Sequence, residues 1–275
     1  MKKILKLFSP LLFLIVSLAA QAQPYERVVS LAPSLSQSLY FLGVQDKLVG
    51  CTNYCTMALK DNKEVVGSSI KVNLEKVISL KPDLVVVSGF TSPEDIEILR
   101  KFGIRVQTYK FPTSYKEICE QFVHLGKLLG KENLADSIVA ESTRTIDAIK
   151  AKSKWEKRPK IFFQIGANPV FTVIPKTFMD DYIHYLGGEN IAKDLTNGLI
   201  GREFVVAKNP DYIFIVTMGI VGEEEQQIWR KYRHLNATKS NQIYIIDSEI
   251  ACQPTPITFA QTMEVINNLI NKKQK

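Results

Sequence analysis

The sequence predicts an α/β protein built from two doubly wound lobes, which are joined by one long rigid helix and enclose a ligand cleft. The joining helix is predicted over residues 133–154, a stretch without Gly or Pro. Its apolar stripe consists of Leu134, Ile138, Ile146 and Ile149, which recur at helical spacing. At ~1.5 Å per residue the helix spans about 30 Å, the diameter of a small domain. Strand and helix signals alternate on both sides of it, as in doubly wound sheets.

A repeated motif relates the two halves of the chain. Glu75 stands seven residues before Pro82-Asp83, and Glu203 stands seven residues before Pro210-Asp211. A continuous apolar run follows each Pro-Asp pair. Such runs are typical of strands that are buried on both faces of a parallel sheet. We therefore expect two lobes of similar construction.

Capping residues bound the elements of the first half. We expect strands at 27–31, 48–51, 84–87 and 105–109, and helices at 36–42, 74–80, 93–102 and 115–129. Asn73 and Ser92 precede two of these helices and are good N-cap residues. Gly43 and Gly103 follow the ends of two helices, where the left-handed conformation favours glycine.

Pro159 ends the linking segment, and the second half repeats the pattern. Strands are expected at 160–165, 212–216 and 242–247, and helices at 178–186, 202–208, 223–232 and 258–271. The predicted divisions are a leader at 1–22, a first lobe at 23–130, a linking helix at 131–158 and a second lobe at 159–275. Doubly wound sheets bind ligands at loops beyond the carboxyl ends of their strands. Those loops are predicted at 32–36, 52–56, 88–91, 166–170, 217–221 and 248–256.

The leader is predicted to be a signal peptide that is cleaved after residue 22. Three lysines precede the apolar segment 7–19, and Ala20-Gln21-Ala22 fits the small-x-small cleavage rule. Ser9-Pro10 interrupts the apolar run, which is shorter than the ~20 residues that cross a bilayer. No Cys stands at the cleavage site. We therefore expect release into the periplasm without a lipid anchor.

The charge pattern does not indicate a nucleic-acid partner. The chain has 35 basic and 28 acidic residues and a net charge of +7. Three of the lysines lie in the leader, which has no acidic residue, so the mature chain carries +4. The basic residues are spread over predicted helix surfaces and form no stripe with interleaved aromatic residues.

Four cysteines in an exported chain raise the question of disulfides. Cys119 lies on an apolar helical face and is expected to be a buried thiol. Cys51 and Cys55 flank a short turn, and Cys252 follows the last strand. A bridge requires Cα atoms within ~7 Å, so the sequence leaves any pairing open.

Familiar catalytic motifs are absent from the sequence. It contains no G-x-S-x-G elbow, no G-x-G-x-x-G fingerprint, no Walker A motif and no C-x-x-C. The three histidines lie far apart, at His124, His184 and His234. We therefore expect no metal site, no cofactor and no enzymatic activity. Tyr54 and Phe90 lie in cleft loops, where each could stack on a ligand or serve ordinary packing.

The chain resembles the periplasmic binding proteins of ABC importers, in the two-lobe class that takes up cobalamin, ferric siderophores and haem. The resemblance lies in an ordered set of stretches that covers nearly the whole chain: RVVSLAPSLSQSLYFLG at 27–43, LVGCTNYC at 48–55, NLEKVISLKPDLVVV at 73–87, KIFFQIGANPVFTV at 160–173, YLGGENIAKD at 185–194 and GREFVVAKNPDYIFI at 201–215. Within the class, the second-lobe stretches look most similar to the cobalamin-binding branch.

The resemblance implies a corrinoid ligand in the cleft. The residues expected to hold it are Pro33, Tyr54, Ser88, Phe90, Ile165, Asn168, Glu249 and Gln253. Tyr54 matches a cleft tyrosine of that branch. The chain departs from the branch elsewhere, because Ser69 and Ser88 stand where it has cleft tryptophans, and Glu249 and Gln253 stand where it has an Asp/Arg pair.

The resemblance also implies a partner, the permease and ATPase complex of an ABC importer in the inner membrane. In the family, one surface glutamate of each lobe meets arginines of the permease, and Glu75 and Glu203 match those positions. We expect a monomer that binds a small molecule. A haem or ferric-siderophore carrier of the same fold is one alternative, and an exported α/β hydrolase that uses Ser34, Ser88 or Asp247 is another.

Overall fold

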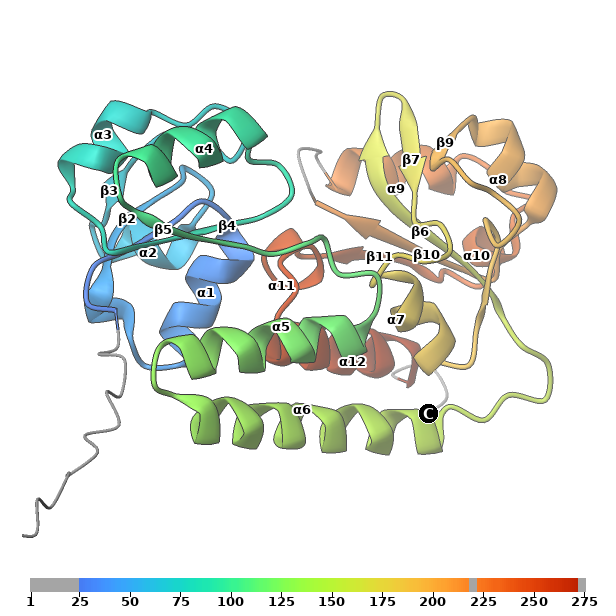
Figure 1. Ribbon diagram of the computed structural model, residues 1–275. Helices are drawn as coiled ribbons and strands as arrows, with labels where there is room; N and C mark the ends of the chain where they lie inside the picture. The colour runs from blue at the N-terminus through green and yellow to red at the C-terminus, as the bar shows by residue number, and fades with distance from the viewer. Residues whose placement is uncertain (1–24, 218–221, 272–275) are drawn as a thin grey trace, which may run out of the picture.

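The computed structural model describes residues 25–217 and 222–271. It has two lobes, each with its own sheet, and a layer of three long helices that runs beneath both lobes (Figure 1). The predicted signal peptide at 1–22 and residues 218–221 of one predicted cleft loop lie outside the described residues. In the part that the structure describes, no helix is long and apolar enough to cross a membrane.

The first lobe is built on five parallel strands in the order β3-β2-β1-β4-β5. The strands are β1 (Val28–Ser30), β2 (Leu48–Cys51), β3 (Glu64–Val65), β4 (Leu84–Val87) and β5 (Arg105–Thr108). The helical segments that accompany them are α1 (Pro33–Phe41), the short η1 (Gln45–Lys47), α2 (Thr56–Lys60), α3 (Leu74–Ser79) and α4 (Pro93–Lys101). The expected caps are present, because the side chains of Asn73 and Ser92 accept hydrogen bonds from Lys76 N and Asp95 N.

Strand β4 shows why this sheet has helices on both faces. Leu84 and Val86 pack on one side with residues of α1 and of the long helix α5 (Tyr115–Leu128). Val85 and Val87 pack on the other side with residues of α3 and α4. All four side chains are fully buried. The continuous apolar run therefore fills two cores, and the doubly wound first lobe predicted from the sequence is confirmed.

The second lobe has a mixed sheet in the order β11-β10-β6-β7-β9, with β8 paired to β6. Its strands are β6 (Lys160–Ala167), β7 (Val170–Thr172), β8 (Glu189–Asn190), β9 (Leu199–Ile200), β10 (Tyr212–Val216) and β11 (Ile243–Ile246). Its shorter helices are α7 (Asp180–Tyr185), α8 (Arg202–Lys208), α9 (Gly222–Arg230), α10 (Asn236–Lys239) and α11 (Ser248–Ala251). β10 is parallel to β6 and β11, whereas β7 is antiparallel to β6 and β9.

The loop predicted at residues 166–170 is shorter in the structure and consists only of the turn at Asn168-Pro169. β6 continues through Ala167, turns at Asn168-Pro169 and returns as β7. Val170 and Thr172 are buried and Phe171 is half exposed. This alternation is that of a strand, but three residues are too few for it to be recognised in the sequence.

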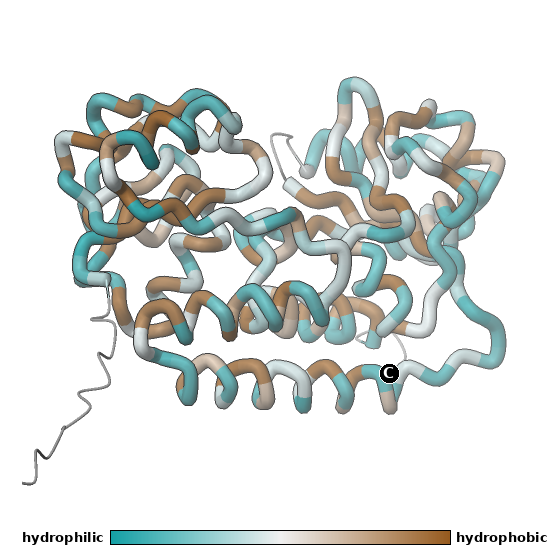
Figure 2. Tube along the Cα trace, viewed as in Figure 1, coloured by the Kyte–Doolittle hydropathy of each residue, from teal (hydrophilic) through white to brown (hydrophobic). Residues whose placement is uncertain are grey.

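Three long helices form a layer beneath the lobes (Figure 1). They are α5, α6 (Glu132–Lys152) and α12 (Pro256–Asn271), and α6 packs against both of the others. Figure 2 shows hydrophobic and hydrophilic residues in turn along α6, as expected for a helix with one buried face. The buried residues of α6 are Ala135, Ser142, Ile146 and Ile149.

The structure corrects three details of this layer. Leu134, which we placed on the buried stripe of α6, is 42% exposed, and the small Ala135 faces the core instead. The helix also ends at Lys152 and does not extend to residue 158, because the backbone leaves the helical conformation at the C-cap residue Ser153, where ψ is 66°. In addition, Tyr115 and Ile118 at the start of α5 belong to the core of the second lobe, although the sequence assigns α5 to the first.

Candidate functional site

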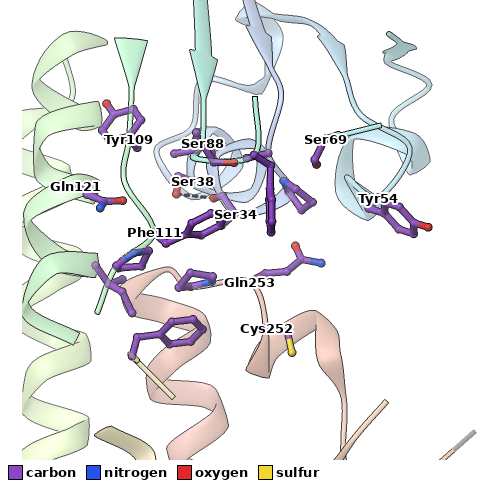
Figure 3. Close-up of a pocket in the computed structure, with 18 of the residues that line it drawn as sticks. Ser34, Ser38, Tyr54, Ser69, Ser88, Tyr109, Phe111, Gln121, Cys252 and Gln253 are labelled. Carbon is purple, nitrogen blue, oxygen red and sulfur yellow. Dashed lines mark hydrogen bonds between the residues drawn. The ribbon is translucent and has the colours of Figure 1, made fainter. Parts of the chain in front are cut away.

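A cavity of about 740 Å³ lies between the lobes. Its walls come from the loops that follow β1, β2, β4 and β5, from one face of α5, and from the second lobe around Phe178 and α11 (Figure 3). Because these strands are parallel, their carboxyl ends meet at one edge of the sheet, and their loops converge there. The volume is that of a typical small-molecule site.

The first-lobe wall of the cavity is rich in serine. Pro33 and Ser34 begin α1, whose N-cap residue Ala32 provides no side-chain hydrogen bond. The Ser38 hydroxyl donates to Ser34 O at 2.8 Å, which is the dashed contact in Figure 3. Ser88 follows β4 and lies beside them in the lining. This wall therefore offers hydroxyl groups and backbone amides without formal charge.

Aromatic rings line the cavity at Tyr54, Phe90 and Phe111. The rings of Phe90 and Phe111 pack edge to face, with 4.4 Å between centroids and 70° between planes. Gly89 permits this approach, because a Cβ atom there would meet the Phe111 ring at 2.9 Å. Phe90 is 57% exposed and Tyr54 is 66% exposed. Large apolar rings left open in a concave site are available to pack on a ligand.

Two glutamines place acceptor oxygens where the lobes meet. Gln37 of α1 donates from Nε2 to Glu249 O of α11 at 3.3 Å, a hydrogen bond that joins the lobes. Gln253 lies in the middle of the cleft, between the first-lobe serines and Cys252 (Figure 3). The Oε1 atoms of Gln37 and Gln253 are buried and have no hydrogen-bond partner among the described residues. A buried acceptor without a partner costs about 1–3 kcal/mol, so a ligand that donates to Gln253 would recover that energy.

The cavity has few charges. Among the described residues that line it, only Lys110 and Glu249 carry a formal charge. The lining also includes Tyr109, whose hydroxyl lies 3.0 Å from His124 Nδ1. Burial raises the pKa of Tyr109 above its usual value, so its phenol stays protonated at neutral pH.

Six of the eight residues expected to hold a ligand line this one cavity, namely Pro33, Tyr54, Ser88, Phe90, Glu249 and Gln253. Ile165 and Asn168 are not among its lining residues, because β6 and its hairpin place them elsewhere. The expected set omitted Tyr109, Lys110 and Phe111, which also line the cavity. They follow β5 directly. They were therefore predictable from the principle that ligands bind at loops beyond the carboxyl ends of the strands.

The repeated motif separates into a structural part and an exposed part. Asp83 accepts from the backbone N–H groups of Glu26 and Arg27, and Asp211 accepts from Lys160 N, so each aspartate holds the start of a neighbouring strand. Glu75 and Glu203 are exposed residues in the first turns of α3 and α8 and are not among the described residues that line the cavity. Both helices lie on the side of the lobes away from α6 (Figure 1).

The serines proposed for a hydrolase make no hydrogen bond to a histidine among the described residues. Ser34 and Ser88 line the cavity, but none of the histidines is among its described lining residues. His184 instead lies 3.0 Å from Asp180 in α7. Asp247 accepts from Glu249 N and caps α11. Among the described residues, no group of three or more His, Cys, Asp or Glu side chains is placed to hold a metal ion.

The family model described as periplasmic binding protein matches residues 28–250. An ABC transporter substrate-binding lipoprotein of Bacillus subtilis, YvrC, which is itself uncharacterised, is 30% identical over 84% of this chain and 76% of its own length. A vitamin B12-binding protein of Vibrio parahaemolyticus is 25% identical over 98% of both chains. That of Vibrio vulnificus strain CMCP6 is 26% identical over 96% of this chain and 97% of its own.

Solved structures share the fold at lower sequence identity. The periplasmic vitamin B12-binding protein BtuF of Vibrio cholerae has a TM-score of 0.76 and 22% identity, covering 92% of this chain and 99% of its own. The periplasmic haem-binding protein RhuT of Roseiflexus sp. RS-1 has a TM-score of 0.79 and 20% identity, covering 91% and 99%. The same two-lobe architecture therefore occurs in proteins named for different ligands.

Proposed function

Because the chain belongs to the periplasmic binding protein family, we propose that it captures a corrinoid of the cobalamin type in its interlobe cleft. It then delivers this cargo to the permease and ATPase complex of an ABC importer in the inner membrane. We further propose that it acts in the periplasm as a monomer, after cleavage of a signal peptide at 1–22. The corrinoid is the transported cargo and not a cofactor.

The chemistry of the cleft lining carries this proposal. A corrinoid such as cobalamin has broad apolar faces and an edge of primary amides, which donate and accept hydrogen bonds without charge. The cleft offers exposed rings at Tyr54, Phe90 and Phe111 for the faces. It offers serine hydroxyl groups and the unpartnered Gln253 Oε1 for the amides. The vitamin B12-binding relatives, which match over nearly the whole chain, support the same ligand.

Haem and ferric siderophores fit this lining less well. Haem carries two carboxylates, and many ferric siderophores are anionic, whereas Lys110 is the one cation among the described lining residues. Iron can be ligated by a tyrosine phenolate, and Tyr109 is available in the cleft. However, burial raises the pKa of Tyr109 and thereby opposes the phenolate form. The haem carrier remains the second candidate because of this one residue.

Calorimetry with purified protein tests the ligand. We expect cyanocobalamin to bind with heat release at micromolar concentration, and Tyr54→Ala to weaken binding by about fivefold or more, since stacking contributes ~1 kcal/mol. A matched variant at Phe102, an exposed aromatic residue outside the described lining, should bind as tightly as the wild type when changed to Ala. No heat with cyanocobalamin at tens of micromolar, beside tight binding of haem or a ferric siderophore, would move the assignment to the alternatives.

A further inference from the structure

Two cysteines lie at the base of the loop that carries Tyr54 into the cleft. Cys51 is the last residue of β2, and Cys55 is the N-cap residue of α2. Between them, Asn53 and Tyr54 line the cavity. Both thiols are buried, at 0% and 1% exposure, whereas the Tyr54 side chain is 66% exposed. The cysteines therefore bracket a short exposed turn from within the protein.

Cys51 and Cys55 belong to one buried cluster, and the thiol of each shifts the pKa of the other. Cys55 Sγ also accepts from the Ser36 hydroxyl of α1 at 2.9 Å and lies 3.2 Å from Thr52 Oγ1. The interaction with Cys51 lowers the pKa of Cys55 most, and the hydrogen bonds with Ser36 and Thr52 lower it further, whereas burial opposes them. The interaction with Cys55, and next the burial of the thiol, raise the pKa of Cys51. A thiol with a lowered pKa thus lies in the same cluster as a second thiol, as thiol–disulfide exchange between them requires.

We propose that Cys51 and Cys55 are a modification site, at which an intraloop disulfide forms and fixes the turn that presents Asn53 and Tyr54 to the cleft. The oxidant is a disulfide, such as glutathione disulfide or the active-site disulfide of an oxidoreductase. The Cys55 thiolate attacks one sulfur of the oxidant and releases the other as a thiolate. Cys51 then loses its proton, attacks the Cys55 sulfur of the mixed disulfide and releases the second thiolate. The two cysteines lose two protons and two electrons, and the oxidant gains the two electrons.

The other two cysteines serve as internal controls. Cys119 packs against the core of the second lobe, where burial raises its pKa to about 11. Cys252 lies against the same core, and burial raises its pKa to about 12. Neither is a thiolate at neutral pH, so both should react slowly with the oxidant.

Mass spectrometry tests the disulfide without any substitution. The protein is expressed from its full sequence, purified and reduced. It is then equilibrated in glutathione buffers that contain an increasing fraction of glutathione disulfide. Each sample is finally denatured and alkylated. Trypsin then yields the peptide 48–60, which holds both cysteines and has no internal Lys or Arg. We expect this peptide to be unalkylated and lighter by two hydrogen atoms in oxidising buffer, while Cys119 and Cys252 remain alkylated. Alkylation of both Cys51 and Cys55 in fully oxidising buffer would overturn the proposal.

Hydrogen exchange of the same peptide tests the effect on the turn. We expect the amides of residues 52–55 to exchange several-fold faster after reduction, and the Cys51→Ser/Cys55→Ser double variant to exchange at the fast rate in both buffers. Equal exchange in the two forms of the wild type would contradict a role in fixing the turn.

A binding measurement extends the test to the cleft, and this part rests on the proposed corrinoid ligand. Cyanocobalamin should bind the oxidised protein several-fold more tightly than the reduced protein. Equal affinity would overturn the link between the disulfide and the cleft. Absence of binding in both forms, beside a redox-dependent exchange rate, would count against the corrinoid and support the disulfide site itself.

Discussion

Lys81 and Asn209 occupy equivalent positions in the two lobes. Each stands before the Pro-Asp pair of the repeated motif, and each has a left-handed backbone, with φ of 48° and 47°. This conformation costs a residue with a Cβ about 1–2 kcal/mol, although asparagine adopts it more readily than lysine. The second lobe therefore has the better residue at this turn.

Exchanging these residues should change stability in opposite directions. We expect Lys81→Asn to raise the free energy of unfolding by ~0.5–1 kcal/mol. Asn209→Lys should lower it by about 1–3 kcal/mol, because it also removes the hydrogen bonds that Asn209 makes with Asn236 N at 2.8 Å and Asn236 Oδ1 at 3.2 Å. Urea unfolding measures both values, and a loss of stability in Lys81→Asn would contradict the strain argument.

Gln253 should show opposite effects on stability and binding. Gln253→Leu removes a buried acceptor that has no partner among the described residues, so we expect the free energy of unfolding to stay the same or to rise by up to ~1 kcal/mol. The same change should weaken cyanocobalamin binding by about 5- to 30-fold. Urea unfolding and calorimetry on one preparation provide the two values.

Gln226 provides the matched control for this prediction. Its Nε2 donates to Ile243 O at 2.7 Å, and it is not among the described residues that line the cleft. Gln226→Leu should therefore lower stability and leave binding unchanged. Loss of stability in Gln253→Leu with unaltered affinity would place Gln253 among the structural residues instead.

Single residues of the site were predictable where they follow a regular strand. Ser88 and Phe90 come after β4, whose apolar run is evident in the sequence. Ile165 and Asn168 were misplaced, because β6 extends into a hairpin that depends on pairing with β7 and β9. Such pairing is a long-range effect that no local pattern reveals.

At the scale of elements, several helices carry a glutamate at the second helical position, among them Glu75 in α3, Glu94 in α4 and Glu203 in α8. All three are exposed and compensate the helix dipole, each by about 0.3–1 kcal/mol. Only Glu75 and Glu203 belong to the repeated motif. If the dipole were their whole role, Glu94 would be equivalent to them.

We predict that Glu75→Ala and Glu203→Ala weaken docking to the permease and leave ligand affinity intact, with a larger loss in the double variant. Charge reversal to Lys should be worse, because like charges would then face each other. The measurement is ligand-stimulated ATP hydrolysis by the cognate transporter in liposomes, with Glu94→Ala as the control that loses only a dipole interaction. Stimulation by the double variant equal to that by Glu94→Ala would leave only the dipole account.

Elements with a strong local signal were predictable, and very short ones were not. The ends of β2, β4, β10 and α8 agree with the sequence prediction to the residue. The prediction omitted α2, β3, β7, β8, β9, α10 and α11, each of two to five residues. Segments this short contain less than two helical turns or a single strand alternation, so tertiary pairing determines them.

At the scale of the whole molecule, α6 links two lobes whose cores meet the same helical layer. Ile146 and Ile149 of α6 pack in the core that includes the second-lobe sheet, and Ala135 packs in the first-lobe core. α5 likewise contributes Tyr115 to one core and Phe122 to the other. Rotation of the lobes would therefore disturb two continuous helices as well as their packing.

We predict that the lobes close only slightly when ligand binds. Wide closure would break several hydrogen bonds within α6, each contributing ~1 kcal/mol net. Small-angle scattering with and without cyanocobalamin should give nearly equal radii of gyration. A large decrease on binding would show that α5 and α6 bend, contrary to this account.

The visible absorption spectrum of the protein isolated from its native cells tests the central claim most directly. Corrinoid, haem and ferric siderophores have different bands, so the spectrum identifies the cargo that the cleft selects in the cell. We expect corrinoid bands in the wild type and their loss in Ser88→Phe, which fills the cleft with a ring. Haem or siderophore bands in the wild type, or corrinoid bands that persist in Ser88→Phe, would contradict a corrinoid held in the interlobe cleft.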